Sequence, residues 1–227
     1  ALLAEEMEAA AMALAEKRIA SVQDGMEVLM QAIIQLPYYL EHVKVGRRDL
    51  PVVLLPILNE LRSVRGESLL SETALFSPYI EHNPNLSQGL RAQMSTPEFS
   101  LWLRKTRQTL QVATLQLLKG EDTATAVHYL NRLFAKLNKT LGGTPQGLVW
   151  LPALAFSEWL SKQATVPKSA KLLLRQLDQL LKQSMDHGAD VIGRPPAEEL
   201  LKNLLFYVAR TESRGDAIRL VQKRFRL

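Results

Sequence analysis

Apolar side chains recur at intervals of three and four residues along almost the whole of this 227-residue chain. This spacing places them on one face of an α-helix, whereas a half-buried β-strand needs strict alternation. Two early series show it: Leu3, Met7, Ala10 and Leu14, then Met26, Leu29, Ile33, Leu36 and Leu40. The pattern predicts an all-α fold of antiparallel helical bundles, and no alternating segment competes with it.

The segment 67–92 loses this spacing and is rich in Pro, Asn and Gly. Such a stretch predicts a long irregular connection, partly packed on a surface, between two helical units. Just before it, Asp49 is predicted to cap a third helix, with Pro51 in the first turn. Residues 1–66 are then the later helices of a truncated first bundle, and residues 93–227 form a second bundle.

The second bundle is predicted to begin at an S-x-x-E capping box. Ser95 and Glu98 supply the two box residues, and Pro97 suits the first helical position. Gly120 is predicted to end this helix, and Asp122 to cap the next one. Helices joined by such short turns are typical of antiparallel bundles.

Cysteine is absent from the chain. This excludes disulfides, thiolate catalysis and cysteine metal sites, and it fits a reducing compartment. No stretch approaches the roughly 20 apolar residues that a membrane span requires. The expected location is therefore the cytoplasm, without membrane insertion.

The net charge of +5 is concentrated at the C-terminal end. The basic residues there are Arg214, Arg219, Lys223, Arg224 and Arg226, opposed only by Asp216. A basic helix of this kind can bind nucleic acid, which is one alternative function. The other interpretation is a solvated helix end, where cations are favoured by the helix dipole. Basic residues are not interleaved with exposed aromatic residues here, so nucleic acid is not the expected partner.

The four histidines do not show the spacing of a metal site, and the chain has no phosphate-binding loop or nucleophile elbow. No catalytic residue, cofactor or metal is therefore expected. In a histidine-phosphotransfer (HPt) box, a His precedes a Lys-Gly or Lys-Ser pair. Lys119 and Gly120 form such a pair, but no His precedes them. Phosphotransfer from His42 or His128 is the remaining chemical alternative.

Five segments carry a resemblance to a known family: residues 28–41, 54–62, 65–67, 70–72 and 200–210. They resemble the N-terminal region of the ChpA/PilL-type hybrid chemotaxis histidine kinases of type IV pilus systems, a region shared with FimL. In that family, HPt domains and degenerate HPt-like domains precede a kinase core and a receiver. The resemblance therefore implies HPt-like bundles that have lost the phosphoacceptor.

The resemblance also implies a function. A bacterial cytoplasmic scaffold module is expected, non-catalytic itself, within a type IV pilus chemosensory system that controls twitching motility. The parent protein resembles a histidine kinase, so whether an enzyme contains this segment stays open. The expected partners are other pilus chemosensory or polar-localisation proteins, through which the chain would reach the cell pole.

One helix end and the turn after it carry residues suited to docking. Tyr and Arg are enriched in binding hot spots because they combine a large contact area with directed hydrogen bonds. The predicted binding residues are Tyr38, Tyr39, Glu41, Arg47, Arg48 and Asp49. In the alternative interpretation, both tyrosines pack into the bundle and the charges only solvate the turn.

Overall fold

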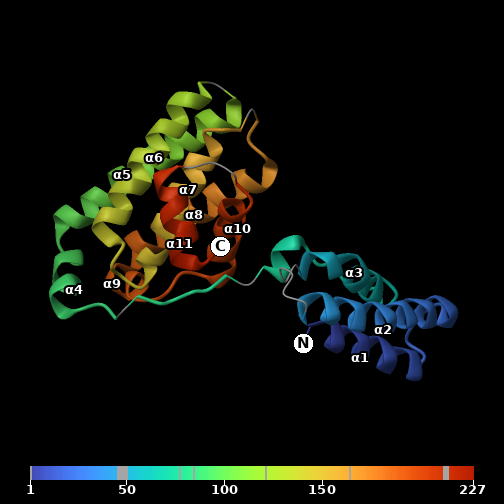
Figure 1. The fold of residues 1–227 in the computed structure, drawn as a ribbon. Helices are drawn as coiled ribbons and strands as arrows, with labels where there is room; N and C mark the ends of the chain where they lie inside the picture. Colours follow the sequence, from blue (N-terminus) through green and yellow to red (C-terminus); the bar gives the residue numbers. More distant parts are fainter. Residues whose placement is uncertain are drawn as a thin grey trace. The chain divides into compact units, whose positions relative to one another are not determined.

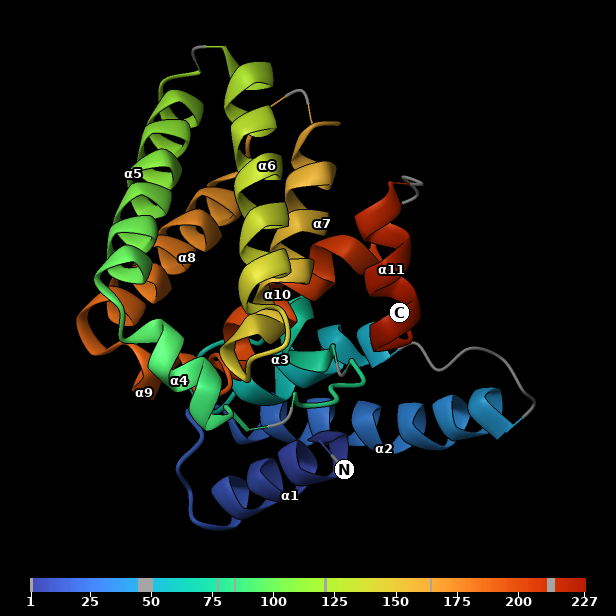
Figure 2. The ribbon, with the colours of Figure 1, turned by 90° about the vertical axis from the view of Figure 1, so that its left-hand side faces the viewer.

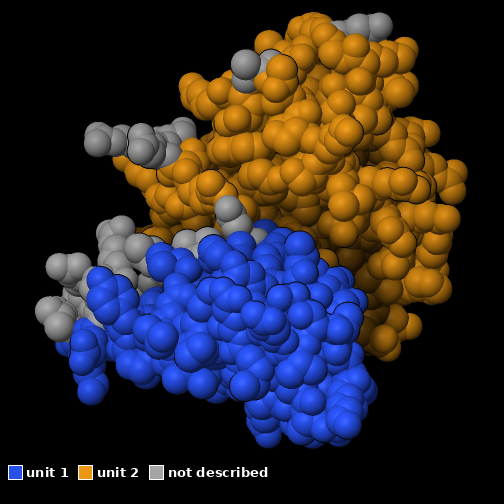
Figure 3. Space-filling view, turned by 90° about the vertical axis from the view of Figure 1, so that its right-hand side faces the viewer, with its two compact units in different colours: residues 1–77 blue, residues 78–227 orange. Residues whose placement is uncertain are grey.

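The computed structural model describes residues 2–44, 51–76, 78–83, 85–120, 122–163, 165–211 and 215–227. These residues form eleven α-helices, three short 3-10 helices and no strand, which confirms the predicted all-α class. The chain divides into two compact units, unit 1 (Ala1–Ser77) and unit 2 (Pro78–Leu227), which are coloured separately in Figure 3.

Unit 1 is built from three helices that lie side by side (Figure 1). They are α1 (Leu2–Ala15), α2 (Val22–Lys44) and α3 (Leu55–Ser63), with 3-10 turns η1 (Pro51–Leu54) and η2 (Glu72–Leu75). The core they enclose is formed by Leu3, Ala10, Ala32, Leu54, Ile57, Leu58 and Leu61. Pro51 opens η1 and α3 begins at Leu55, later than the sequence predicts, while Asp49 lies outside the described residues.

A buried carboxylate ties α1 to the end of α3. Glu6 accepts hydrogen bonds from Arg62 Nη1 at 2.6 Å and from Arg65, and Arg65 Nη2 also donates to Glu67 at 2.9 Å. Burial by itself raises the pKa of Glu6, but the bonds from Arg65 and Arg62 outweigh it and hold the pKa below its ordinary value of 4.5. Arg62, Arg65 and Glu67 belong to the segments that carry the family resemblance, so part of that resemblance reflects the packing of unit 1.

Helix α2 turns a different side inward from the one predicted. Of the predicted stripe, Met26, Ile33 and Leu40 are 59%, 54% and 51% exposed, so this part of the prediction is wrong. Only Leu29 and Leu36 pack against the core of unit 1. The spacing of apolar residues in α2 is helical, but it does not identify the buried side, because both sides are apolar.

Unit 2 is a larger helical assembly in which α5 and α6 run side by side in opposite directions, with α7 beside α6 (Figure 2). Its helices are α4 (Gln88–Met94), α5 (Pro97–Lys119), α6 (Thr123–Leu141), α7 (Trp150–Leu160), α8 (Lys168–His187), α9 (Ala189–Ile192), α10 (Glu198–Ala209) and α11 (Asp216–Phe225), with the 3-10 turn η3 (Gln146–Val149). Phe134, Trp150 and Phe156 are fully buried at its centre. The residues that α5 and α6 bury in this core, among them Leu103, Leu110, Leu130 and Leu137, recur at the helical spacing of three and four residues.

The caps of α5 and α6 agree with the sequence, with one shift. Thr96, not Ser95, is the N-cap of α5, and its side chain accepts from the Phe99 N–H at 3.3 Å. The shift follows from Pro97, which occupies the first helical position and fixes the cap one residue before it. Gly120 ends α5 with a φ of 74°, and Asp122 caps α6, as predicted.

The predicted connection 67–92 is shared between the two units. Its second part is fastened to unit 2 by Asn83, whose Nδ2 donates to the carbonyls of Gly142 and Thr144 at 2.8 and 2.7 Å. The same part ends in α4, a short helix that the sequence pattern did not indicate. Residues 78–83 and 85–92 therefore belong structurally to the second unit.

The N-terminus of α11 is capped from another helix. Its local N-cap residue, Gly215, offers no side chain, and the Glu158 carboxylate of α7 accepts from the N–H groups of Ala217 and Ile218 at 3.2 and 3.1 Å. A Cβ atom on Gly215 would lie 2.2 Å from Glu158 Oε2, so only glycine allows this approach. The contact joins α7 to α11.

Candidate protein-binding surface

A row of exposed apolar side chains runs along α2 on the side that points away from the core of unit 1. We call this surface the outer face of α2; its large residues, each 51–68% exposed, are Val22, Met26, Met30, Ile33, Ile34, Tyr38 and Leu40. Single exposed apolar side chains are ordinary on protein surfaces, but a continuous helical row of them marks an interaction site.

The inner side of the same helix packs closely because it carries small residues. Ala32 is fully buried, and a Cβ atom on Gly25 would lie 2.9 Å from Leu14 Cδ2, so α2 packs closely on α1 at this point. Asp24, Glu27 and Gln31 form a polar strip at helical spacing, and Gln23 and Glu41 are further exposed polar residues of the helix. A helix that is apolar on both sides is typical of one covered on both sides.

The predicted binding residues are only partly described. Tyr38 is 65% exposed and belongs to the outer face, whereas its neighbour Tyr39 packs against the core of unit 1. Glu41 is exposed near the end of α2. Arg47, Arg48 and Asp49 lie outside the described residues. The sequence drew attention to the tyrosines, but it assigned Met26, Ile33 and Leu40 of the apolar row to the buried side of the helix.

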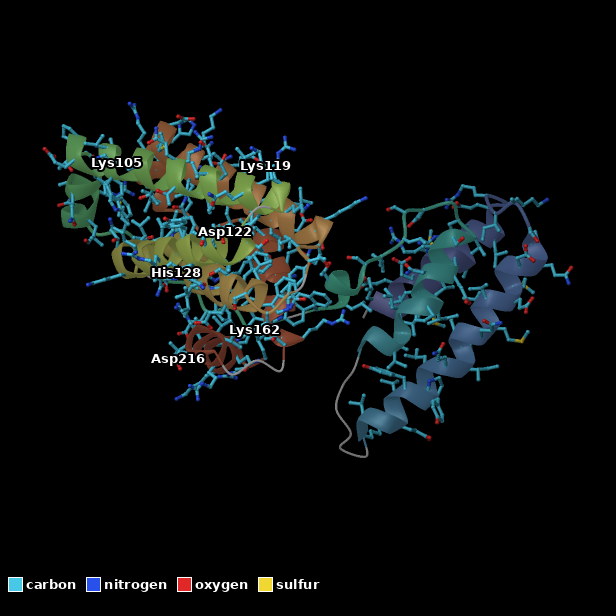
Figure 4. The ribbon with its side chains drawn as sticks, turned by 90° about the horizontal axis from the view of Figure 1, so that it is seen from above. Lys105, Lys119, Asp122, His128, Lys162 and Asp216 are labelled. Carbon is cyan, nitrogen blue, oxygen red and sulfur yellow. The ribbon has the colours of Figure 1, made fainter. Side chains whose placement is uncertain are left out.

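The two candidate phosphoacceptors differ in what the structure shows. The side chain of His42 lies outside the described part of the chain. His128 lies on α6 (Figure 4) and is exposed. The centre of its ring is 6.4 Å from the centre of the Tyr129 ring. Lys119 ends α5, whereas His128 belongs to α6, so the Lys-Gly pair and His128 do not share a helix.

Arginines at the basic C-terminal end contact residues of unit 2. Arg224 donates to Asn83 Oδ1 at 2.8 Å, and the Arg226 guanidinium lies 4.3 Å from the centre of the Tyr79 ring. Arg219 pairs with Asp216 at 2.6 Å. Three of the cations on which the nucleic-acid alternative depends therefore already have partners within the unit.

Within the described ranges, no group of three or more His, Asp or Glu side chains is arranged to hold a metal ion. Among the same residues, no helix combines the length and apolarity needed to cross a bilayer.

An all-helical chain with an uncovered apolar helix face has the features of a protein-interaction module. Residues 95–227 match the family model of the FimL scaffold protein second domain, and the chain belongs to this family. This match covers α5 to α11, which is most of unit 2.

A curated relative extends the similarity into unit 1. The scaffold protein FimL of Pseudomonas aeruginosa is 30% identical over 207 residues, which are 90% of this chain and 36% of that protein. The chain thus spans little more than a third of the relative's length. No solved structure matches it. The FimL part of the predicted resemblance is confirmed; the links to a kinase, to an HPt-like fold and to a pilus system stay predictions.

Proposed function

We propose that this chain is a non-catalytic interaction module of a FimL-like scaffold, and that it binds its partner protein through the outer face of α2. The observation that carries the proposal is the apolar row on this helix, 51–68% exposed from Val22 to Leu40. The setting we propose is the cytoplasmic chemosensory system of type IV pili. There the partners are other signalling or polar-localisation proteins, and the output is twitching motility.

Two considerations support this function over the alternatives. The matched family is one of scaffold proteins, whose purpose is to hold other proteins. The chemistry of the described residues offers exposed apolar area, which gives affinity when another surface covers it. The chain spans only part of its relative, so the role of the whole scaffold is proposed here for this segment alone.

The test is a double charge insertion on the outer face, Met30→Glu with Ile34→Glu. Both side chains are at least 60% exposed, so the free energy of unfolding should change by less than about 1 kcal/mol. Pull-down of pilus chemosensory proteins and twitching motility should both be lost, because two charges would have to be buried against the partner.

The matched control is Met12→Glu with Gln31→Glu. It adds the same two charges at an exposed position of α1 and on the polar strip of α2. Motility and pull-down should remain with the control. Retention of both with the outer-face variant as well would show that the partner binds elsewhere.

A further inference from the structure

The two units carry opposite charge. Unit 1 has 11 Asp and Glu residues against 7 Lys and Arg, and unit 2 has 12 against 21. The net charge of +5 therefore divides into −4 and +9. The C-terminal segment from Arg214 to Arg226 contributes +4 of this +9, so the remaining excess lies elsewhere in unit 2.

Several of these cations border an apolar groove between α5 and α8. The groove has a volume of about 620 Å³, and its exposed apolar residues are Leu115, Leu118 and Leu172. Lys168, Lys171 and Arg175 line the α8 side. Among the residues that the structure describes, none forms an ion pair with these three cations.

The acidic residue in the lining does not neutralise this rim. Asp178 is held by Arg107, whose Nε and Nη2 donate to its two carboxylate oxygens at 2.9 and 3.1 Å. A bidentate pair of this kind satisfies both oxygens of the carboxylate. The net charge along the groove is therefore positive.

The cations on α8 occupy positions at which they destabilise the helix. Lys168 is its first residue and Lys171 follows three residues later, and the first turn has no acidic residue. A helix N-terminus disfavours cations, because the positive end of the helix dipole lies there. Lys171 and Arg175 also repel each other at a spacing of four residues. Their placement costs stability, which is expected where charge serves binding.

We propose that this groove binds an acidic amphipathic helix of a partner protein, with the apolar face of that helix on the leucines and its carboxylates against Lys168, Lys171 and Arg175. The groove lies between two helices, an arrangement that accepts a third helix through apolar anchors at helical spacing. The positive rim selects acidic flanks and excludes basic ones. This site is in unit 2 and does not depend on the outer face of α2.

The test uses the full chain and a fluorescein-labelled synthetic peptide as the probe. The peptide is an amphipathic helix of about 18 residues, roughly 27 Å long, with Leu on one face and Glu on both flanks. Fluorescence anisotropy should show saturable binding that weakens as salt rises. A second peptide with Lys in place of every Glu should not bind.

Three variants locate the site. The groove variant reverses the rim charges, Lys168→Glu with Lys171→Glu and Arg175→Glu, and should lower the affinity for the acidic peptide by about tenfold or more. Its thermal stability should stay equal or rise, because the helix dipole favours the new carboxylates. The apolar variant, Leu115→Ser with Leu172→Ser, should also lose binding while keeping the helical circular dichroism spectrum.

The third variant is the control. It makes the same change in net charge in the hollow between α5 and α6, Lys105→Glu with Arg132→Glu and Lys136→Glu, and should keep at least half of the affinity. Equal loss in the control and groove variants would overturn the proposal, since net charge alone would then explain binding. Absence of peptide binding to the unmodified chain would overturn it as well.

Other occupants of the groove give distinct results. Duplex DNA or phosphatidylserine vesicles that bind more tightly than the peptide, with the loss confined to the groove variant, would assign the groove to a polyanion or a lipid surface. Concentration-dependent dimerisation that the groove variant abolishes would assign it to a second copy of this chain. Either result overturns the proposed partner. The outer-face variant Met30→Glu with Ile34→Glu should bind the peptide normally, which separates this inference from the proposed function.

Discussion

A polar side chain of unit 1, that of Glu6, connects two helices that are far apart in the sequence. Glu6 has a side chain only 8% exposed and lies between Arg62 and Arg65, which come from 56 and 59 positions further along the chain. The sequence shows a glutamate on the first helix, but nothing in its spacing reveals that two arginines approach it. Long-range pairs of this kind follow from how α1 packs on α3 and are invisible to local patterns.

This pair predicts how unit 1 responds to acid. The pKa of Glu6 is below 4.5 in the folded state, so its stabilisation is present above that pH and is lost as the pH falls through the folded pKa. Glu6→Gln should destabilise unit 1 by about 2–3 kcal/mol at pH 7 and should flatten this loss at acid pH. Thermal unfolding of unit 1 between pH 7 and 3 measures both effects. The exposed Glu8→Gln is the control, and an identical acid response in all three proteins would contradict the assignment.

The exposed His128 permits a direct test for phosphotransfer. Its side chain is accessible on α6, but the Lys-Gly pair of a working box belongs to the end of α5 instead. We therefore expect no acid-labile label on the chain when it is incubated with a chemosensory kinase core and labelled ATP, beside a functional HPt domain. Label that disappears in His128→Ala would make phosphotransfer the correct function.

At the scale of helices, the sequence predicted which segments are helical and where they end. It predicted less well which side of a helix is buried. The start of α5 at Pro97, its end at Gly120 and the cap at Asp122 were correct because each depends on local backbone chemistry. The buried side of α2 was wrong because both of its sides are apolar. Side-chain size decides between them, since only the side with Gly25 and Ala32 lets α2 approach α1 closely.

Candidate sites were harder to predict for the same reason. The groove between α5 and α8 joins residues about 55 positions apart, such as Leu115 and Leu172, and no local pattern brings them together. Likewise, the short helices α4 and α9 were missed because four to seven residues are too few to establish a period. The sequence did identify Tyr38 as a candidate binding residue, and Tyr38 lies on the outer face of α2.

The remote cap on α11 predicts a helix-specific loss of stability. Glu158→Ala leaves the N–H groups of Ala217 and Ile218 without their acceptor and should cost about 1–2 kcal/mol. Glu158→Gln keeps an acceptor oxygen without the charge and should cost less. Hydrogen exchange should show faster exchange in α11 than in α5. Uniform acceleration across unit 2, or none in α11, would mean that Glu158 is not its cap.

For the molecule as a whole, the division into two units predicts independent folding. Each unit has a separate hydrophobic core, and that of unit 2 is the larger. Residues 78–227, produced alone, should therefore be helical and unfold cooperatively, with the same midpoint as one of two transitions in the full chain. Circular dichroism and calorimetry measure this. A single transition in the full chain, together with an unfolded 78–227 fragment, would contradict the division.

The two-sided character of α2 also has a consequence for molecular evolution. Its inner side, with Gly25 and Ala32, must fit α1 and α3 of the same chain, so substitutions there should be compensated within this protein. Its outer side carries exposed side chains such as Met26, Met30 and Ile34. When the sequences of many species are compared, substitutions at these outer positions should therefore correlate with substitutions in a second protein. The gene that shows this correlation identifies the partner.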